Sequence, residues 1–324
     1  MNIAFAGFKH YHIGTLYEEA KQNPDINIIG AWEPTEDGRR LAGDFDIEFN
    51  YESLEDILND SQVDTVILGG YYGERGEHAI KALKAGKNVY TDKPLCTRIC
   101  ELDEIERIAR EKNLKVGCML TLRFGMGMKT VRDIIMSGKL GKIGTIDMTA
   151  QHPLSYGSRP HWYFEEGKHG GTINDIAIHG IDIVRFVTGY GLKRVVAART
   201  WNHFADKEPQ FKDCGQFMVE LENGAGFMGD VSYAAPAKNG MKLPFYWRIL
   251  FWGTKGVIEY KINGESVEAA FTDDEGLKPI KPEMYDATCL GEFIKELRGE
   301  ESIITTKDVL RTSRDALTMQ AAAE

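Results

Sequence analysis

The sequence predicts an α/β protein of two domains, in which a doubly wound parallel sheet is followed by an α+β domain with an open, mostly antiparallel sheet. The chain has 324 residues, which exceeds the roughly 250 to 300 at which a single hydrophobic core stops growing. Short β-rich runs alternate with helical stretches through the first third, and longer alternating runs follow. We therefore expect domains over residues 1–120 and 121–324.

The first domain is predicted from runs rich in β-branched and aromatic residues. These runs, read as parallel strands, cover residues 3–6, 26–32, 65–69, 88–91 and 115–120. Between them apolar residues recur at helical spacing, as in Leu54, Ile57 and Leu58, and Gly86 follows another such stretch as a helix stop. Strands that alternate with helices in this way are typical of a nucleotide-binding domain.

The second domain is predicted from longer alternating runs, which cover residues 142–151, 195–201, 216–222 and 227–233. Asn223-Gly224 separates two of these runs and favours a type I′ hairpin, whose central residues both need positive φ. A second hairpin is expected to turn at residues 253–256. Helices are expected over residues 129–136, 172–187, 285–298 and from 307 to the end.

Composition excludes several classes of protein. The formal net charge is −10 and the pI about 5.4, so nucleic acid and membrane surfaces are poor partners. The start lacks a basic and apolar leader, and no run of about 18 apolar residues follows. Five cysteines without close CxxC spacing favour a reducing compartment. We therefore expect a cytoplasmic protein.

The first candidate site is the turn after the first strand, where a dinucleotide-binding fold approaches a pyrophosphate. Gly7 is in place, but Lys9 and His12 stand where the G-x-G-x-x-G fingerprint has glycine. An ordinary tight turn is the alternative. Glu33 ends the second strand, where a carboxylate can accept hydrogen bonds from an adenosine ribose and repel a 2′-phosphate. This favours NAD, although Arg39 and Arg40 leave NADP open and Glu33 could be a solvated loop residue.

The fourth strand delivers Asp92 and Lys93 to the carboxyl edge of the sheet, where ligands of open α/β sheets bind. Pro94 restricts the backbone of Lys93 and so helps to aim its ammonium group. A lysine cation there can polarise a substrate oxygen. A surface lysine paired with Asp92 is the alternative.

The third candidate site is the helix that follows Gly170-Gly171. Asp175 and His179 are four residues apart and share one helix face, with Asp182 one turn further. Oxidation of an alcohol requires removal of its hydroxyl proton, for which histidine is suited near neutral pH. Alternatively, Asp175 completes a capping box, Asp182 pairs with Arg185, and the histidine is merely packed.

Together these segments resemble one family, the glucose-fructose oxidoreductases, inositol dehydrogenases and MocA-like oxidoreductases. The matching pieces, in the expected order along nearly the whole chain, are Gly7, residues 78–87, Asp92-Lys93-Pro94, residues 122–124, and the helix with Asp175 and His179. The resemblance implies an N-terminal Rossmann-like domain that binds NAD(P) and a C-terminal substrate-binding and oligomerisation domain. It also implies oxidation or reduction of a sugar, polyol or related alcohol.

The resemblance also implies roles for individual residues. Lys93 matches the catalytic lysine, His179 the base and Asp175 its acidic partner. The residues expected to bind the cofactor are Gly7, Phe8, Lys9, His12, Glu33, Gly70, Tyr71, His78, Asp92 and Lys93. The residues expected to face the substrate are Arg123, His161, Trp162, Tyr163, Asp175 and His179. The chain departs from the family pattern at Lys9 and His12, and at residues 69–72, where a Thr-Pro-like turn is usual.

These observations favour an NAD-dependent oxidoreductase acting on a small carbohydrate-like alcohol, with Lys93 and His179 reaching the same reacting oxygen. Two alternatives stay open: a redox-neutral glycoside hydrolase that uses bound NAD, and a cofactor-binding regulator without turnover. No familiar metal-ligand spacing is present, so no metal is expected. The open sheet would leave an apolar face, so we expect a homodimer or homotetramer, and no nucleic acid or membrane as partner.

Overall fold

The computed structural model describes all 324 residues, which divide into two compact units. The first unit comprises Met1–Met119, Pro160–Gly170 and Cys289–Ser313, and the second comprises Leu120–Arg159, Gly171–Thr288 and Arg314–Glu324. The expectation of two contiguous domains over 1–120 and 121–324 is therefore corrected. Two later segments of the chain complete the first unit, and local sequence patterns carry no signal for such a return.

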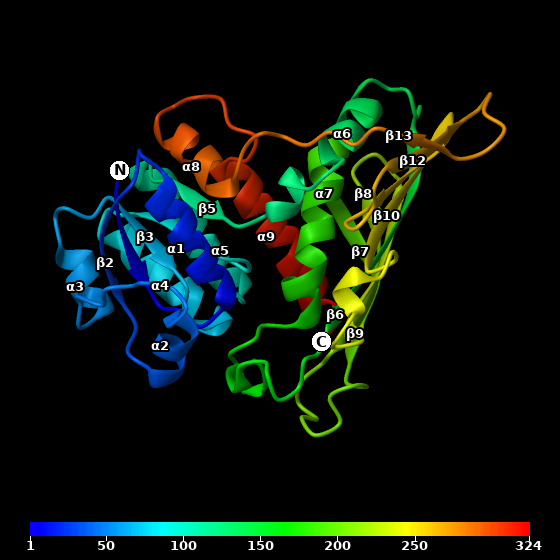
Figure 1. Cartoon of the computed structure of the whole chain (residues 1–324). Helices are drawn as coiled ribbons and strands as arrows, with labels where there is room; N and C mark the ends of the chain where they lie inside the picture. The colour runs from blue at the N-terminus through cyan, green and yellow to red at the C-terminus, as the bar shows by residue number, and fades with distance from the viewer. The chain divides into compact units, whose positions relative to one another are not determined.

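The first unit contains a five-stranded parallel sheet of order β2-β1-β3-β4-β5 (Figure 1). Its strands are β1 (Asn2–Ala6), β2 (Asn27–Trp32), β3 (Thr65–Leu68), β4 (Asn88–Thr91) and β5 (Val116–Cys118). Its helices in the first part of the chain are α1 (Tyr11–Gln22), α2 (Glu36–Ala42), α3 (Leu54–Asn59), α4 (Tyr72–Lys84) and α5 (Ile99–Lys112), and α8 (Cys289–Leu297) is added from the far end. The predicted doubly wound parallel sheet is confirmed.

Most strands of the first sheet are buried, as is typical of a parallel sheet with helices on both faces. All four residues of β3 are buried, as are four of the five in β1, and strands covered by helices on both faces read as continuous apolar runs. Gly86 has a φ of 81° just after α4, so it provides the predicted helix stop. Phe293 of α8 packs on Tyr90 of β4, with ring centroids 5.2 Å apart. The returning segment therefore belongs to this core.

The second unit contains an eight-stranded sheet of order β13-β12-β11-β10-β6-β9-β8-β7. Its strands are β6 (Ile143–Pro153), β7 (Leu192–Trp201), β8 (Cys214–Leu221), β9 (Gly226–Ala235), β10 (Trp247–Gly253), β11 (Gly256–Lys261), β12 (Val267–Phe271) and β13 (Lys278–Ile280). Neighbouring strands are antiparallel except β6 and β9, which pair in parallel. The predicted open, mostly antiparallel sheet is confirmed.

Both predicted hairpins form, but one has a different turn. Gly253 pairs with Gly256 across the expected turn between β10 and β11. Between β8 and β9 only Gly224 has positive φ, at 84°, and Asn223 does not. The side chain of Asn223 instead accepts a hydrogen bond from the backbone N–H of Ala225 at 3.0 Å. The type I′ prediction is therefore wrong, because the local Asn hydrogen bond and a single left-handed glycine complete a longer loop.

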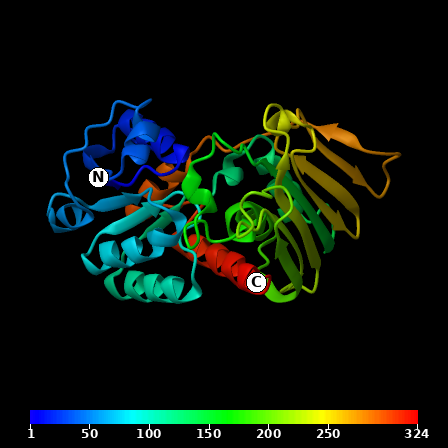
Figure 2. The ribbon, with the colours of Figure 1, turned by 90° about the horizontal axis from the view of Figure 1, so that it is seen from below.

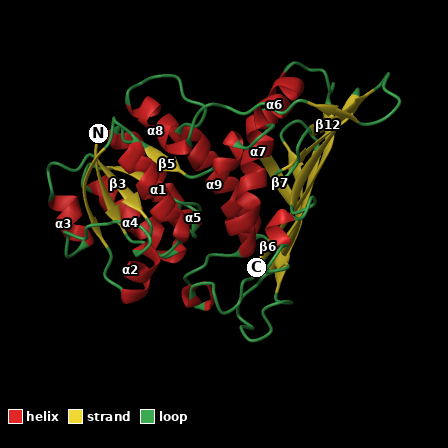
Figure 3. Cartoon of the chain, viewed as in Figure 1, coloured by secondary structure: helices red, strands yellow, loops and turns green.

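One face of the eight-stranded sheet is covered by helices of the same unit. These are α6 (Met128–Met136), a π-helical turn η3 (Ile173–Ala177) and α7 (Ile178–Thr188), while α9 (Thr306–Ala321) begins in the first unit and ends in the second. A Cβ at Gly180 of α7 would lie 2.0 Å from the sulfur of Met148 in β6, so the Met148 side chain packs directly against the helix backbone there. Figures 2 and 3 show the sheet with α7 on one of its sides. No helix combines the length and apolar character that a membrane crossing requires.

Candidate functional site

The carboxyl ends of β1 and β3 approach so closely that only glycine fits between them. Gly7 has a φ of 91°, and a Cβ there would lie 2.7 Å from the backbone nitrogen of Gly70. A Cβ at Gly69 would lie 2.1 Å from the carbonyl oxygen of Gly7. The backbone N–H of Lys9 donates to the Gly69 carbonyl at 2.9 Å, which closes the turn. A backbone cradle of this kind at the carboxyl edge of a parallel sheet fits a dinucleotide.

Glu33 has a different environment from the one expected. Its side chain is fully buried and accepts hydrogen bonds from the backbone N–H of Phe8 at 2.6 Å and of Thr35 at 2.9 Å. Lys9 forms an ion pair with it at 2.5 Å. The expectation that Glu33 is open to a ribose is therefore corrected, because its carboxylate already holds the β1–α1 and β2–α2 connections together.

A buried carboxylate holds two histidines at the start of α1. Nδ1 of His10 lies 3.0 Å from Oδ2 of Asp92, and Nδ1 of His12 lies 3.1 Å from Oδ1. Burial alone would raise the pKa of Asp92, but the charge and hydrogen bonds of His12 and His10 hold that pKa well below its usual range. Asp92 is therefore an anion that fixes the orientation of both imidazoles, so that His12 stands at the turn where the cofactor is expected.

The same three side chains are of the types that hold metal ions. One ligand atom from each of His10, His12 and Asp92 lies within 4.8 Å of the others. However, the guanidinium of Arg75 lies 3.4 Å from Oδ2 of Asp92, and both are fully buried. A cation would have to compete with this fixed positive charge. The absence of a metal therefore stays our expectation.

Acid should destabilise the first unit through His10. Burial, with a further contribution from His12, lowers the pKa of His10 to about 4, whereas an unfolded histidine titrates near 6.5. The unfolded chain therefore binds this proton first, so the contribution of His10 to stability is complete above pH 6.5 and is lost as the pH falls toward 4, by about 3 kcal/mol. Urea unfolding at pH 7 and pH 4 should show a smaller loss of stability for His10→Gln than for the wild type.

His161 provides the control, because it belongs to the same unit and its side chain is 76% exposed. The variant His161→Gln should lose as much stability on acidification as the wild type. An equal loss in the His10→Gln variant would contradict the role given to the buried imidazole.

Lys93 follows β4 and lies above Tyr72, with its Nζ 5.9 Å from the ring centroid. Its backbone is held by Arg75, a residue that sequence reasoning missed. Nη1 of Arg75 donates to the carbonyls of Asp92 at 2.9 Å and of Lys93 at 2.8 Å, and Nε donates to Gly70 at 3.0 Å. The one available signal was a charged residue on the apolar face of a helix. Arg75 therefore positions Lys93 at the sheet edge.

The segment that contains Trp162 and Tyr163 packs on the first unit. Nε1 of Trp162 donates to the Lys9 carbonyl at 2.9 Å, and the Tyr163 hydroxyl lies 2.7 Å from that of Tyr72. The ring of Tyr71 lies 5.5 Å from that of Trp162. Trp162 and Tyr163 thus line the turn that contains Gly7 and Lys9, where the cofactor is expected. That they also contact substrate stays a prediction.

His161 and His78 lie in different surroundings. Nδ1 of His161 lies 3.5 Å from Oε1 of Glu165, its ring lies 6.3 Å from that of Phe164, and its side chain faces solvent. His78 packs beside Trp32 of β2 at 6.5 Å, and burial lowers its pKa. A Cβ placed at Gly70 would lie 3.7 Å from Nδ1 of His78. His78 is thus close to the predicted cofactor edge, whereas nothing in the structure directs His161 to a substrate.

In the second unit, Asp175 lies in the π-helical turn η3 and His179 in the first turn of α7. Wider turns of this kind often occur at functional sites. The hydroxyl of Tyr233 donates to Oδ2 of Asp175, and the hydroxyl of Thr172 donates to the carbonyl of Lys212. Thr172 makes no capping hydrogen bond, so the capping-box alternative does not apply. Asp175 is instead tied to the sheet.

Aromatic side chains that sequence reasoning missed surround this pair. His152 of β6 stacks on Tyr233 of β9, with centroids 6.2 Å apart and planes 14° from parallel. The hydroxyl of Tyr246 lies 3.4 Å from Nδ1 of His152, and burial raises the pKa of Tyr246 to about 12. Trp247 of β10 lies 5.5 Å from His179. The arrangement combines a carboxylate, an imidazole and flat apolar rings, which suits a polyhydroxylated ring or chain.

Arg123 is placed differently from its expected position at a wall that faces substrate. Its side chain is 2% exposed and pairs with both oxygens of Asp182, at 2.8 and 2.6 Å. Arg185, the alternative partner of Asp182, pairs with Asp315 at 2.5 Å. Both expectations are corrected, because the fork of Arg123 matches a carboxylate that comes from another helix.

Models of known protein families match two parts of the chain. A family model described as "Oxidoreductase family, NAD-binding Rossmann fold" matches residues 1–119, and one described as "GFO/IDH/MocA C-terminal domain" matches residues 128–259. A myo-inositol 2-dehydrogenase of Thermotoga maritima is 24% identical over 308 residues, which are 91% of this chain and 89% of the relative.

Two further matches bear on cofactor and fold. A scyllo-inositol 2-dehydrogenase (NADP(+)) of Bacillus subtilis is 31% identical over 150 residues, which are 45% of this chain and 40% of the relative. The crystal structure of an aldose-aldose oxidoreductase from Caulobacter crescentus, in complex with glycerol, has a TM-score of 0.81 at 18% identity, covering 100% of this chain and 97% of that one. At that identity the likeness shows the fold.

Proposed function

Because the chain belongs to the family of glucose-fructose oxidoreductases, inositol dehydrogenases and MocA-like oxidoreductases, and is thus a dehydrogenase that acts on CH–OH groups, we propose that its substrate is a sugar or polyol and its cofactor a nicotinamide dinucleotide, NAD or NADP. The relative of similar length is named for myo-inositol. The observation that carries the proposal is Asp175 on the π-helical turn, bound by Tyr233, together with His179 in the first turn of α7. These side chains combine a base with acceptors for hydroxyl groups.

In the proposed reaction the alcohol loses a hydride from carbon and a proton from oxygen, and becomes a carbonyl. Nicotinamide, when bound, supplies the hydride acceptor. His179 takes the hydroxyl proton, and Asp175, held by Tyr233, positions a neighbouring hydroxyl. Lys93, whose backbone Arg75 fixes, is the residue that we propose as the catalytic lysine. Gly7, Gly70 and the ends of β1 and β3 would hold the diphosphate.

A panel of sugars and polyols, incubated with NAD and with NADP, tests the proposal. Reduced cofactor should accumulate in step with carbonyl product for at least one polyol. Release of a reducing sugar from glycosides without net reduced cofactor would indicate redox-neutral glycoside cleavage instead. Cofactor binding with no turnover on any compound would favour a regulator. The five free cysteines fit a reducing compartment such as the cytoplasm, so the assay should contain a thiol reductant.

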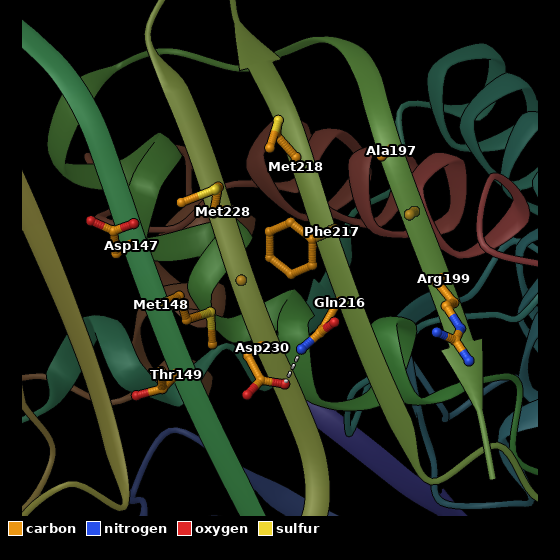
Figure 4. Close-up of a pocket in the computed structure, with 12 residues that line it drawn as sticks. Asp147, Met148, Thr149, Ala197, Arg199, Gln216, Phe217, Met218, Met228 and Asp230 are labelled. Atoms are coloured by element: carbon orange, nitrogen blue, oxygen red, sulfur yellow. Dashed lines mark hydrogen bonds between the residues drawn. The ribbon is translucent and has the colours of Figure 1, made fainter.

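The uncovered face of the eight-stranded sheet supports a proposal that the protein is a homo-oligomer. A shallow groove of about 490 Å³ crosses β6, β9, β8 and β7 on this face (Figure 4). Met218 and Met228 are 42% and 47% exposed within it. Arg199 lies at one side of the groove, and Asp147 and Asp230 lie toward the other (Figure 4). A twofold axis would place Arg199 of each copy against the acidic side of the groove in the other copy. We therefore propose that a second copy of the chain covers this face.

The variant Met228→Asp should therefore shift the protein toward monomers, because it buries a carboxylate in the contact. Light scattering at micromolar concentration should show the loss of dimer. Met136→Asp supplies the control, since Met136 is exposed on α6 and lies outside the groove. A monomeric wild type would contradict the proposal.

A further inference from the structure

The carboxylate of Glu33 has no capacity left for a ribose. Oε2 accepts from the N–H of Phe8, and Oε1 accepts from the ammonium of Lys9 and from both the backbone N–H and the hydroxyl of Thr35, at 2.6, 2.5, 2.9 and 2.8 Å. A carboxylate offers about four lone-pair positions. A Cβ at Gly38 would lie 2.1 Å from its carboxyl carbon, so the backbone of α2 covers it.

Lys9 is the residue that occupies this carboxylate, and it is also a departure from the glycine fingerprint. Its side chain is 6% exposed, and its ammonium contacts both Glu33 and the hydroxyl of Thr35. The indole of Trp162 holds its carbonyl at 2.9 Å. The ring of Tyr71 lies 5.0 Å from its Nζ. These contacts fix both backbone and side chain, so the pair is part of the folded turn.

Lys9 balances the charges of the segment that follows β2. The connection after β2 carries Glu33 together with the exposed Glu36 and Asp37, and opposite them stand Arg39 and Arg40. Arg39 donates through Nε to the Glu33 carbonyl at 2.9 Å. With Lys9 included, three basic groups match three acidic ones. Without it, one negative charge is left where the adenosine ribose of a dinucleotide is expected.

We propose that Lys9 makes the protein bind NAD and NADP nearly equally, because it occupies and neutralises the carboxylate of Glu33. The carboxylate then neither accepts from the ribose hydroxyls of NAD nor repels the 2′-phosphate of NADP. The protein therefore binds the two cofactors with affinities within about fivefold of each other. This inference rests on the proposed use of a nicotinamide dinucleotide and deepens it, since it concerns the adenosine end of the same site.

Dissociation constants for NADH and NADPH, measured by quenching of tryptophan fluorescence, test the inference without reference to turnover. The variant Lys9→Met keeps the length of the side chain and leaves the Glu33 charge uncompensated. We expect the constant for NADPH to rise at least about tenfold relative to that for NADH, because like charges at contact distance repel strongly near a protein surface. The variant Lys9→Arg keeps the charge and should keep the wild-type ratio.

Two further variants separate this effect from a general loss of structure. Lys87 is a buried lysine of the same unit whose Nζ donates to the carbonyls of Asp60 and Val63 at 2.7 and 2.8 Å, and Lys87→Met should leave the NADH to NADPH ratio unchanged. Lys9→Met combined with Glu33→Gln carries no unpaired charge, so it should fold where the single variant fails. Its ratio should be that of the wild type, and its NADH affinity should stay within about threefold.

The inference is overturned by any of three results: a wild type that prefers NADH by more than tenfold, a Lys9→Met variant with an unchanged ratio, or a tenfold loss of NADH affinity in the double variant. Failure of the proposed function has a different appearance. In that case the wild type binds neither cofactor, or it binds them and oxidises no alcohol.

Discussion

The variant His179→Ala should turn over a polyol substrate about 10² to 10⁴ times more slowly than the wild type, the usual contribution of general acid–base catalysis. Tyr233 and Asp175 remain in place in this variant, so hydroxyl groups can still be held. What is lost is the group that takes the hydroxyl proton as the hydride leaves. Steady-state kinetics on the substrate found in the panel should show a fall in kcat and in kcat/KM, with KM changing little.

The binding of cofactor provides the internal check on this result. His179 belongs to the second unit and Gly7 to the first, so the dissociation constant for NADH should stay within about twofold of the wild-type value. His203→Ala is a matched control, because His203 is an exposed histidine of the same unit as His179. Wild-type turnover in the His179→Ala variant would remove the imidazole from the mechanism.

Most of the architecture could be predicted because it is encoded locally. Buried parallel strands such as β3 leave continuous apolar runs, and the position of Gly7 after β1 follows from its need for positive φ. The parallel pairing of β6 with β9 could not be predicted. The alternation of apolar and polar residues specifies which face of a strand is buried. This alternation is the same for a parallel and an antiparallel neighbour.

The residues of the candidate site also divide into those that could be predicted from the sequence and those that could not. Asp92 and Lys93 could be found because they follow a recognisable strand. Arg75 and Tyr233 could not, because each acts on a residue 17 to 58 positions away along the chain. The errors over Glu33 have the same origin. A charged residue shows its own sign in the sequence, whereas its partner is chosen by the tertiary structure.

The variant Arg123→Met should lower the free energy of unfolding by about 3 to 5 kcal/mol, the usual effect of leaving one member of a buried ion pair alone. The guanidinium of Arg123 is bound by both oxygens of Asp182 and packs 4.7 Å from the ring of Phe186. Methionine retains much of the packing and none of the charge, so the cost comes from the buried carboxylate. Urea unfolding of the purified variant measures it.

Removing the second charge separates stability from substrate binding. In the variant that combines Arg123→Met with Asp182→Leu no buried charge is left, and most of the lost stability should return, because well-packed apolar residues often replace a buried ion pair without loss. KM for the polyol should then be close to that of the wild type. If Arg123 instead contacted substrate, the double variant would be stable and its KM would rise at least about tenfold, and the buried pair would have to be reassigned to the substrate wall.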